Sequence, residues 1–428
     1  MSDAATLPDS PPMSRHTLAV LASGPFGRYT AGTVVSQTGT WMQGMAQSWV
    51  MTGLTTSDFT LSLVQAFTSL PMLALMMYGG TVADRFDKRK ILIATQVVQM
   101  ILAVAIGVLV STHHIQIWHI LAAAFILGIS ASFEMPADSA LVPELVDKEN
   151  IGHAIAVDRS VFHGTRLIGP AIAGQLIDLL GAASAFFANA VSFLALIFAL
   201  FSIQPRAQGD AEEESQRSSG MMAGVRYVRG DRPTMAMLGI MASNSMFIFP
   251  FMAVLVLPYA RHDLRLDAGY ASLLMTVSGV GSLVASIGML RVPRRRRLLF
   301  MAISTAGMTA AMLGLAAAQV FWQAALGMTV LAAGASLNYG LANTTIQERA
   351  PAAMRGRVSA LAMMAWAGVM PFASMSVSAV ADTVGIRRVV VGCAVGYALA
   401  AFYVFAGPAR RATELPATAP VVPAPVEA

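Results

Sequence analysis

Four charged side chains lie inside long apolar stretches of the sequence: Glu134, Asp138, Arg159 and Arg166. A charge at the centre of a membrane-spanning helix costs about 2.5–3.5 kcal/mol on insertion scales, so such groups face the protein interior and find partners. Glu134 and Asp138 are four residues apart and therefore lie on one helix face. Two interpretations stay open: an ion pair with Arg159 that fixes helix packing, and an acid that carries a proton, with a pKa that changes as Arg159 moves away.

Arg166 lies seven residues beyond Arg159, which is roughly 10 Å deeper at about 1.5 Å per helical residue. It is the best candidate in the chain to bind an anionic or acceptor-rich small molecule. Backbone packing around Gly169 and Pro170 is the competing explanation for this stretch, and the residues favour neither.

Polar residues recur on one face of the first apolar stretch. They are spaced by three, four, seven, ten and eleven positions: Gln37, Thr40, Trp41, Gly44, Gln47 and Ser48. A polar stripe on an apolar span faces a cavity or another helix rather than lipid. Further amides and a phenol lie in the second half of the chain. We therefore predict a central cavity lined by Gln37, Trp41, Gln47, Arg166, Asn244, Asn338, Tyr339 and Asn343, with ordinary hydrogen bonds between helices as the alternative.

Several chemistries have no sequence signature. There is no G-x-x-x-x-G-K-[ST] phosphate loop and no G-x-S-x-G turn around a nucleophile. His113 and His114 are adjacent, which does not suit a helical metal site, and the single cysteine, Cys393, lies in an apolar run. We predict that the chain is not an enzyme and uses no cofactor or metal.

The amino-acid composition predicts that the segments carrying these residues are membrane-spanning helices. Hydrophobic residues make up 56% of the 428 positions and charged residues 12%, whereas soluble domains average about 25% charged. The net charge of +5 is better explained by orientation in a membrane than by nucleic acid, which we exclude as a partner. The sequence predicts an all-α membrane protein whose partner is the lipid bilayer.

Apolar runs separated by Gly, Pro and charged residues give twelve predicted transmembrane helices. Six are expected at 28–51, 59–83, 91–111, 117–141, 152–180 and 183–201, and six at 234–257, 269–290, 298–317, 321–346, 358–380 and 386–406. With both termini in the cytoplasm, 22 of the 28 Lys and Arg residues fall on the cytoplasmic side and four outside. This bias supports an even number of spans.

A polar stretch at mid-chain divides the sequence into two halves. We predict a cytoplasmic N-terminal tail over 1–27, a six-helix bundle over 28–203, a linker over 204–233, a second bundle over 234–407 and a disordered cytoplasmic tail over 408–428. The halves form two pseudo-repeats with an offset of 204 positions, which pairs Glu144 with Glu348 and two Asp-x-x-Gly sequences, Asp178–Gly181 and Asp382–Gly385.

A charged loop between the second and third spans reads Gly80-Thr-Val-Ala-Asp-Arg-Phe-Asp-Lys-Arg89. It resembles the G-x-x-x-D-R-x-G-R-R signature of the major facilitator superfamily, with Asp87 and Lys88 as departures that look like the branch of drug and siderophore exporters. Four further stretches resemble the same branch: Gln37–Met42, Pro136–Glu144, Arg166–Gly174 and Arg355–Val358. Together the resemblance covers about residues 20 to 406.

The resemblance implies site residues. Gly80–Arg89, which we call the signature loop, is expected to close the inward side through Gly80, Asp84, Arg85, Lys88 and Arg89. Asp84 would face Arg355 and Arg357 at the start of a later helix, and Arg85 would reach Glu144; plain orientation of the loop by its basic residues is the alternative. Gly169, Pro170 and Gly174 resemble an antiport-linked Gly-Pro motif in part, since one of its glycines is Ala173.

The resemblance also implies a monomeric secondary transporter of the cell inner membrane, which exports a small amphipathic siderophore or drug-like molecule by alternating access with the proton as coupling ion. Uptake or uniport by the same fold, and a non-transporting receptor or scaffold, stay open as alternatives.

Overall fold

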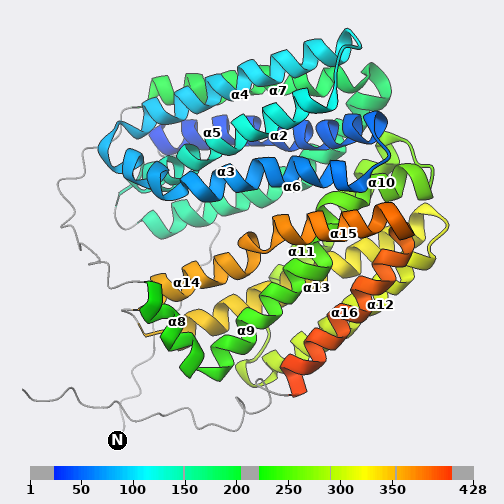
Figure 1. Cartoon of the computed structure of the whole chain (residues 1–428). Helices are drawn as coiled ribbons and strands as arrows, with labels where there is room; N and C mark the ends of the chain where they lie inside the picture. Colours follow the sequence, from blue (N-terminus) through cyan, green and yellow to red (C-terminus); the bar gives the residue numbers. More distant parts are fainter. Residues whose placement is uncertain (1–23, 148–149, 204–220, 290, 352–353, 407–428) are drawn as a thin grey trace, which may run out of the picture. The chain divides into compact units, whose positions relative to one another are not determined.

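The computed structural model describes residues 24–147, 150–203, 221–289, 291–351 and 354–406. The predicted C-terminal tail, all but residues 24–27 of the predicted N-terminal tail, and most of the predicted linker lie outside this range. The described residues are almost entirely helical (Figure 1). Each of the twelve predicted spans falls on a helix or on a run of consecutive helices, and ten of these are long and apolar enough to cross a membrane. The two that do not reach this hydropathy, α2 and α6, carry the polar stripe and the two arginines.

The helices of the first half are α2 (Gly24–Leu54), α3 (Asp58–Arg85), α4 (Lys88–Ser111), α5 (Ile117–Glu144), α6 (Ile151–Leu180) and α7 (Ala182–Ser202). Those of the second half are α8 (Met221–Gly230), α9 (Arg232–Ser243), α10 (Val256–Pro258), α11 (Ala268–Met289), α12 (Arg297–Ala317), α13 (Phe321–Arg349), α14 (Arg355–Met363), α15 (Met370–Val384) and α16 (Ile386–Val404). Short π-helical turns follow α9 at η2 (Asn244–Ile248), η3 (Phe251–Leu255) and η4 (Tyr259–Asp263), and α14 at η7 (Met364–Gly368).

The chain divides into two compact units. Unit 1 comprises residues 1–56, 63–214 and 260–276, and unit 2 comprises residues 57–62, 215–259 and 277–428. In unit 1, α2 packs against α6 and α7, and α4 packs against α5 and α7. In unit 2, α12 packs against α13 and α16, and α9 against α13. Each unit has its own apolar core, around Phe26, Leu92 and Leu200 in unit 1 and around Met237 and Met301 in unit 2.

The signature loop is mostly helical rather than a loop. Helix α3 continues to Arg85 and α4 begins at Lys88, so that only Phe86 and Asp87 join them. Asp87 makes this sharp change of direction possible because its side chain accepts a hydrogen bond from the Arg89 N–H at 2.9 Å and caps α4.

Equivalent glycines end equivalent helices in the two halves. Gly181 after α6 has φ +82°, and Gly385 after α15 has φ +90°. This left-handed conformation is one that glycine adopts without a steric penalty. The two Asp-x-x-Gly sequences therefore have the same backbone role as well as the same letters.

Helix α3 approaches α5 closely at a glycine. A Cβ atom added to Gly79 would lie 1.9 Å from the carbonyl oxygen of Ser132, whereas one added to the adjacent Gly80 would meet no atom within 4 Å. The obstacle at Gly79 is backbone, which cannot rotate out of the way as a side chain can.

We expect Gly79→Ala to lower the apparent melting temperature of the purified protein in detergent, because overpacking of this kind costs about 1–3 kcal/mol. Gly80→Ala is the matched control and should leave the melting temperature unchanged or slightly raised, since alanine favours the helix. Equal melting temperatures for the two variants would contradict the close approach of α3 and α5.

Candidate functional site

Glu134 on α5 is held by neutral donors. The side-chain amides of Gln96 and Gln99, both on α4, donate to its two carboxylate oxygens at 2.9 and 2.5 Å. Gln96 in turn accepts a hydrogen bond from the Ser36 hydroxyl on α2 at 2.8 Å. The acid is thus satisfied in the interior of unit 1 without a cation in direct contact.

Asp138, one turn further along α5, accepts a hydrogen bond from the hydroxyl of Tyr29 on α2. Tyr29 is fully buried, and its ring belongs to the apolar core of the unit. Together the two acids and their donors form a polar group shared by α2, α4 and α5, which we call the acid cluster: Tyr29, Gln96, Gln99, Glu134 and Asp138.

Arg159 does not form the predicted ion pair with these acids. Its side chain is 62% exposed and lies 4.0 Å from Asp158, its neighbour in the chain. The prediction rested on the position of Arg159 along the helix, which does not fix the direction in which the side chain points. Amide and hydroxyl donors occupy the positions around the acids that we had assigned to it.

The three donors of the acid cluster were missed by the sequence analysis. Gln96 and Gln99 stand three residues apart in an otherwise apolar span, which is the same signal that identified the stripe on α2. Tyr29 gave no such signal, because a single aromatic residue in an apolar helix is ordinary.

Arg166 on α6 lies over the ring of Trp41 on α2, with its Cζ atom 5.4 Å from the ring centroid. Trp41 also meets Phe162 edge to face, with 5.6 Å between centroids. A cation over an indole ring gains about 0.5–1 kcal/mol when exposed and about 2 kcal/mol when desolvated. Arg166 is exposed although it lies in the middle of a helix expected to cross the membrane, which fits a side chain that faces a cavity.

Of the two explanations weighed for this stretch, backbone packing is present in the structure, and the substrate contact of Arg166 stays a prediction. A Cβ atom added to Gly169 would lie 2.5 Å from the Trp41 Cβ and 2.9 Å from the Thr38 carbonyl oxygen, so Gly169 lets α6 approach α2. One added to Gly174 would lie 2.0 Å from the Ser272 hydroxyl, and Pro170 is buried. These residues bring the helices together and thereby set the position of Arg166.

Two further stripe residues of α2, Gln37 and Gln47, are packed into unit 1, whereas Thr40 and Gly44 are exposed. Gln37 accepts a hydrogen bond from the Thr165 hydroxyl on α6 at 3.3 Å, and Gln47 is buried. For these two residues the alternative of contacts between helices describes the structure better than a cavity wall.

In unit 2 two of the three predicted amides, Asn244 and Asn338, belong to a buried network. Asn338 donates to the hydroxyls of Thr305 and Tyr397 at 3.0 and 3.1 Å, and the Tyr397 hydroxyl donates to Asn244 at 2.7 Å. Asn244 and Asn338 are 1% and 0% exposed. They therefore hold helices together rather than line a cavity, and Tyr397 is their unpredicted partner.

Two other predicted cavity residues of unit 2 are more accessible. Tyr339 is 37% exposed and its ring lies 5.5 Å from that of Trp366, which in turn meets Phe249 at 5.5 Å. Asn343, one turn further along α13, is half-buried. Trp366 belongs to the π-helical turn η7, and such turns occur often at functional sites.

Glu144, at the end of α5, pairs with Lys88 rather than with Arg85. The Lys88 ammonium lies 2.8 Å from the Glu144 carboxylate, while Arg85 is exposed. Because α4 begins at Lys88, that residue stands directly beside the end of α5. Arg89 donates to the carbonyl oxygen of Leu200 at the end of α7, at 3.1 Å.

The predicted contact of Asp84 with Arg355 and Arg357 stays a prediction. It would join the two units, and the side chain of Arg355 is outside the described residues.

Unit 2 contains an ion pair equivalent to that of Lys88. Arg297, the first residue of α12, donates to both carboxylate oxygens of Glu348 near the end of α13, at 2.8 and 2.9 Å. Nearby, Arg349 bonds to Asp231, the residue that caps α9. Burial opposes ionisation of Asp231, but the hydrogen bonds from Arg349 and Thr234 outweigh it and hold the pKa of this carboxyl below its ordinary value.

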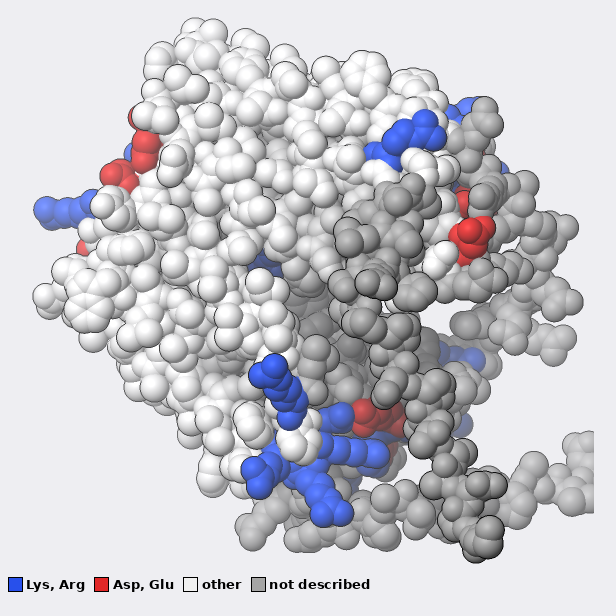
Figure 2. Space-filling model, turned by 180° about the vertical axis from the view of Figure 1, so that it is seen from behind, with Lys and Arg blue, Asp and Glu red and all other residues white. Residues whose placement is uncertain are grey.

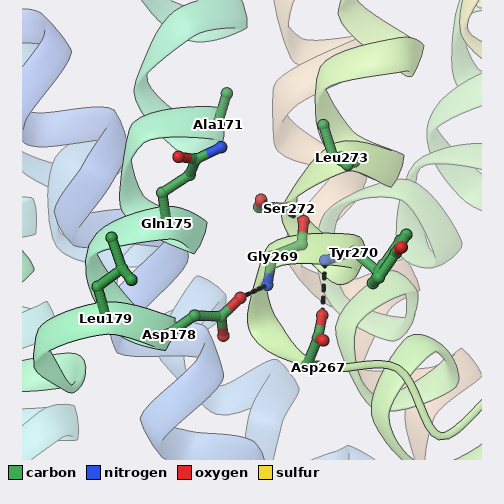
Figure 3. Close-up of a pocket in the computed structure, with 9 residues that line it drawn as sticks. All are labelled: Ala171, Gln175, Asp178, Leu179, Asp267, Gly269, Tyr270, Ser272 and Leu273. Carbon is green, nitrogen blue, oxygen red and sulfur yellow. Dashed lines mark hydrogen bonds between the residues drawn. The ribbon is translucent and has the colours of Figure 1, made fainter.

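Two aspartates cap helix N-termini at the ends of the helices opposite to the Lys88–Glu144 and Arg297–Glu348 ion pairs. In unit 1, Asp178 on α6 accepts the Gly269 N–H of α11 at 2.8 Å, beside a pocket of about 300 Å³ (Figure 3). In unit 2, Asp382 on α15 accepts the backbone N–H groups of Asp58 and Phe59 and the hydroxyl of Ser57, at the start of α3. These are the two aspartates that the 204-residue offset pairs.

Comparison with known proteins agrees with this architecture. A family model described as "Transmembrane secretion effector" matches residues 15–427. The multidrug efflux pump Tap of Mycobacterium tuberculosis is 26% identical over 353 residues, which cover 78% of this chain and 82% of that protein. The staphyloferrin A transporter of Staphylococcus aureus is 29% identical over 164 residues, 38% of this chain and 41% of that protein.

Solved structures of similar fold are transporters as well. The nucleoside transporter NupG has a TM-score of 0.70 at 12% identity, over 90% of this chain and 98% of that one. An inward-facing bacterial homologue of the lysosomal transporter Spinster has a TM-score of 0.67 at 14% identity, over 94% and 98%. The matched proteins are transporters and not enzymes. Because its family model spans nearly the whole sequence, the chain belongs to the transmembrane secretion effectors of the major facilitator superfamily, a family of transporters.

Proposed function

We propose that this protein exports a small amphipathic molecule, of siderophore or drug type, in exchange for protons and by alternating access. The observation that carries the proposal is the acid cluster, in which two half-buried carboxylates have neutral hydrogen-bond donors as direct partners. Membrane-embedded acids of this kind are typical of proton relays in transporters. The relatives with efflux and siderophore names support the substrate class.

The neutral donors allow the carboxylates to take up a proton without leaving an unpaired cation. A guanidinium in contact with Glu134 would favour the charged carboxylate strongly, and release of that charge would leave the arginine unpaired. Amide and hydroxyl donors satisfy the carboxylate oxygens and leave no buried cation behind when the acid takes up a proton. In the proposed cycle Glu134 or Asp138 binds a proton in one state and releases it in the other.

Arg166 and the Trp41 ring are the proposed contacts for substrate. A guanidinium donates in a planar fork that suits carboxylates, and the indole supplies a flat apolar surface beside it. An amphipathic molecule with an acidic or acceptor-rich end matches this pair. Tyr339, Trp366 and Asn343 are the proposed wall in the second half. We place the protein in the cell inner membrane as a monomer with cytoplasmic termini.

Proton coupling is tested in proteoliposomes by following the internal pH while a carboxylate siderophore or a macrolide is added. We expect substrate-dependent proton movement in the wild type, and its loss in Glu134→Gln or Asp138→Asn, because an amide cannot exchange the proton. Asp147→Asn, which changes an exposed acid just beyond α5, is the control and should behave as the wild type. Substrate movement without proton flux would overturn antiport and favour uniport, and flux in the import direction alone would favour uptake.

The substrate contact is tested by comparing arginines on one helix. We expect Arg166→Ala to reduce the transport rate of the carboxylate siderophore at low concentration about tenfold or more, since a hydrogen bond to a charged group contributes about 1.5–3 kcal/mol. Arg159→Ala removes the same charge from an exposed position of α6 and should have little effect on that rate. Equal losses in both variants would show that the total charge of α6 matters and not contact with Arg166.

Alternating access requires contacts that break in one state, and the caps at Asp178 and Asp382 are suitable. Each joins a helix of one sequence half to the start of a helix from the other half: α6 to α11, and α15 to α3. A carboxylate at a helix N-terminus contributes about 0.3–1 kcal/mol, and more when partly buried. In the proposal these two caps stabilise the state that is closed toward the outside.

We expect the double variant Asp178→Asn with Asp382→Asn to open outward more often. In a Cys393→Ser background, a cysteine at Gly44, where an added Cβ meets no atom within 4 Å, should react several-fold faster with an impermeant maleimide added outside. Asp267→Asn is the matched control, because Asp267 caps only its own helix by accepting the Tyr270 N–H at 2.9 Å. A rate in the double variant no higher than in this control would contradict the role of the two caps.

A further inference from the structure

The segment that joins α11 to α12 is unusually basic. Arg291, Arg294, Arg295, Arg296 and Arg297 fall within seven residues, and the segment contains no acid. Arg294–Arg296 form a short 3-10 turn, η5, that leads directly into α12. The first four of these arginines are exposed, and Arg297 is partly covered. Figure 2 shows a dense group of basic side chains beside a broad surface with very few charges.

One arginine of this segment has a clear structural role. Arg297 holds Glu348 with two hydrogen bonds, as Lys88 holds Glu144 in unit 1. Arg294 lies 3.5 Å from the same Glu348 carboxylate. In the described part of the chain no ion pair is found for Arg291, Arg295 or Arg296.

The equivalent segment of the first half shows that helix packing does not require this surplus. Over Asp84–Lys90 four basic residues are accompanied by Asp84 and Asp87, and Lys88 and Arg89 are engaged by Glu144 and Leu200. Among the described residues Glu348 is the one acid that forms ion pairs with the α11–α12 segment, which leaves four of its five positive charges without a compensating carboxylate in that part of the chain.

The position of the surplus relative to the hydrocarbon follows from the exposed apolar residues on both sides. On α11, Val284 and Ile287 are 65% and 55% exposed, and on α12, Leu299 and Ile303 are 56% and 58% exposed. In a membrane-spanning chain such side chains face lipid tails. Ile287 precedes Arg291 by about one helical turn, and Leu299 follows Arg296 by less than one turn. The free arginines therefore lie at the level of the lipid headgroups.

We propose that Arg291, Arg295 and Arg296 form a binding surface for the phosphate groups of anionic phospholipids in the surrounding membrane. A guanidinium donates two parallel hydrogen bonds to a phosphate, and clusters of basic residues beside a membrane helix attract anionic lipid. The apolar faces of α11 and α12 accommodate the acyl chains of the same lipid. These arginines belong to unit 2, whereas the acid cluster and Arg166 belong to unit 1, and the proposed binding surface uses no residue of the proposed transport cycle.

The test measures lipid binding by the purified full-length protein rather than transport. Phosphatidylglycerol or phosphatidylcholine is titrated into the protein in neutral detergent, and bound lipid is counted by native mass spectrometry. We expect the wild type to bind phosphatidylglycerol at least tenfold more tightly than phosphatidylcholine. The triple variant Arg291→Gln, Arg295→Gln, Arg296→Gln should lose this preference.

The matched control is the triple variant Arg226→Gln, Arg229→Gln, Arg232→Gln, which removes the same charge from exposed arginines on α8 and at the start of α9. It should keep the preference. An equal loss in both triple variants would overturn the proposal, because the lipid would then respond to total charge and not to this surface.

Two further measurements exclude misfolding and a soluble ligand. The triple variant Arg291→Lys, Arg295→Lys, Arg296→Lys keeps the charge, so it should fold normally. It should lose part of the preference, since an ammonium lacks the planar fork. Full retention of the preference by the lysine variant would overturn the arginine-specific contact. Inorganic phosphate at millimolar concentration should not displace the lipid, and displacement would identify a soluble anion site instead.

Discussion

Hydrocarbon offers no hydrogen-bond partner, so every polar group inside a membrane-spanning helix depends on another group of the protein. Much of the organisation of both units follows from this constraint. Glu134 is satisfied by two glutamines of α4, and Asn338 by hydroxyls of α12 and α16. Arg166 stands over an aromatic ring. Where the polar groups are, the helices are fixed in rotation as well as in distance, because each bond requires a particular helix face.

At one equivalent position, the two units satisfy an interior polar side chain with different chemistry. The offset of 204 positions pairs Glu134 with Asn338. Each lies on the fourth long helix of its half and is bonded to residues of the third. An acid occupies the site in unit 1 and a neutral amide in unit 2, so a change of protonation affects only the first. The asymmetry suggests that unit 2 supplies a fixed polar core while unit 1 carries the group that can change its charge.

The sequence predicted the positions of helices along the chain better than the direction of side chains around a helix. The spans, the ends marked by Gly181 and Gly385, and the interior position of the acids all follow from patterns along the chain. Partners do not, since one residue turns the side chain by about 100° and an uncertain helix start shifts every face. Arg159 was therefore assigned to acids that it does not contact. Lys88 was missed as the partner of Glu144 because α4 begins at that residue and not after the charged run. Asn338 and Asn343 look alike in sequence, yet only Asn338 lies in the buried network.

The neutral character of the donors affects the free energy needed to change the charge of the acids. Two buried charges in contact form a unit that is costly to break, because either partner left alone keeps its full desolvation penalty. A carboxylate held by amides and a phenol has no such partner to abandon. Its charged and neutral forms differ by the strength of a few hydrogen bonds and by the polarity of the surroundings, and both change when the helices α2, α4 and α5 shift. In the proposed antiport cycle, movements among these three helices change how tightly the acid cluster holds a proton.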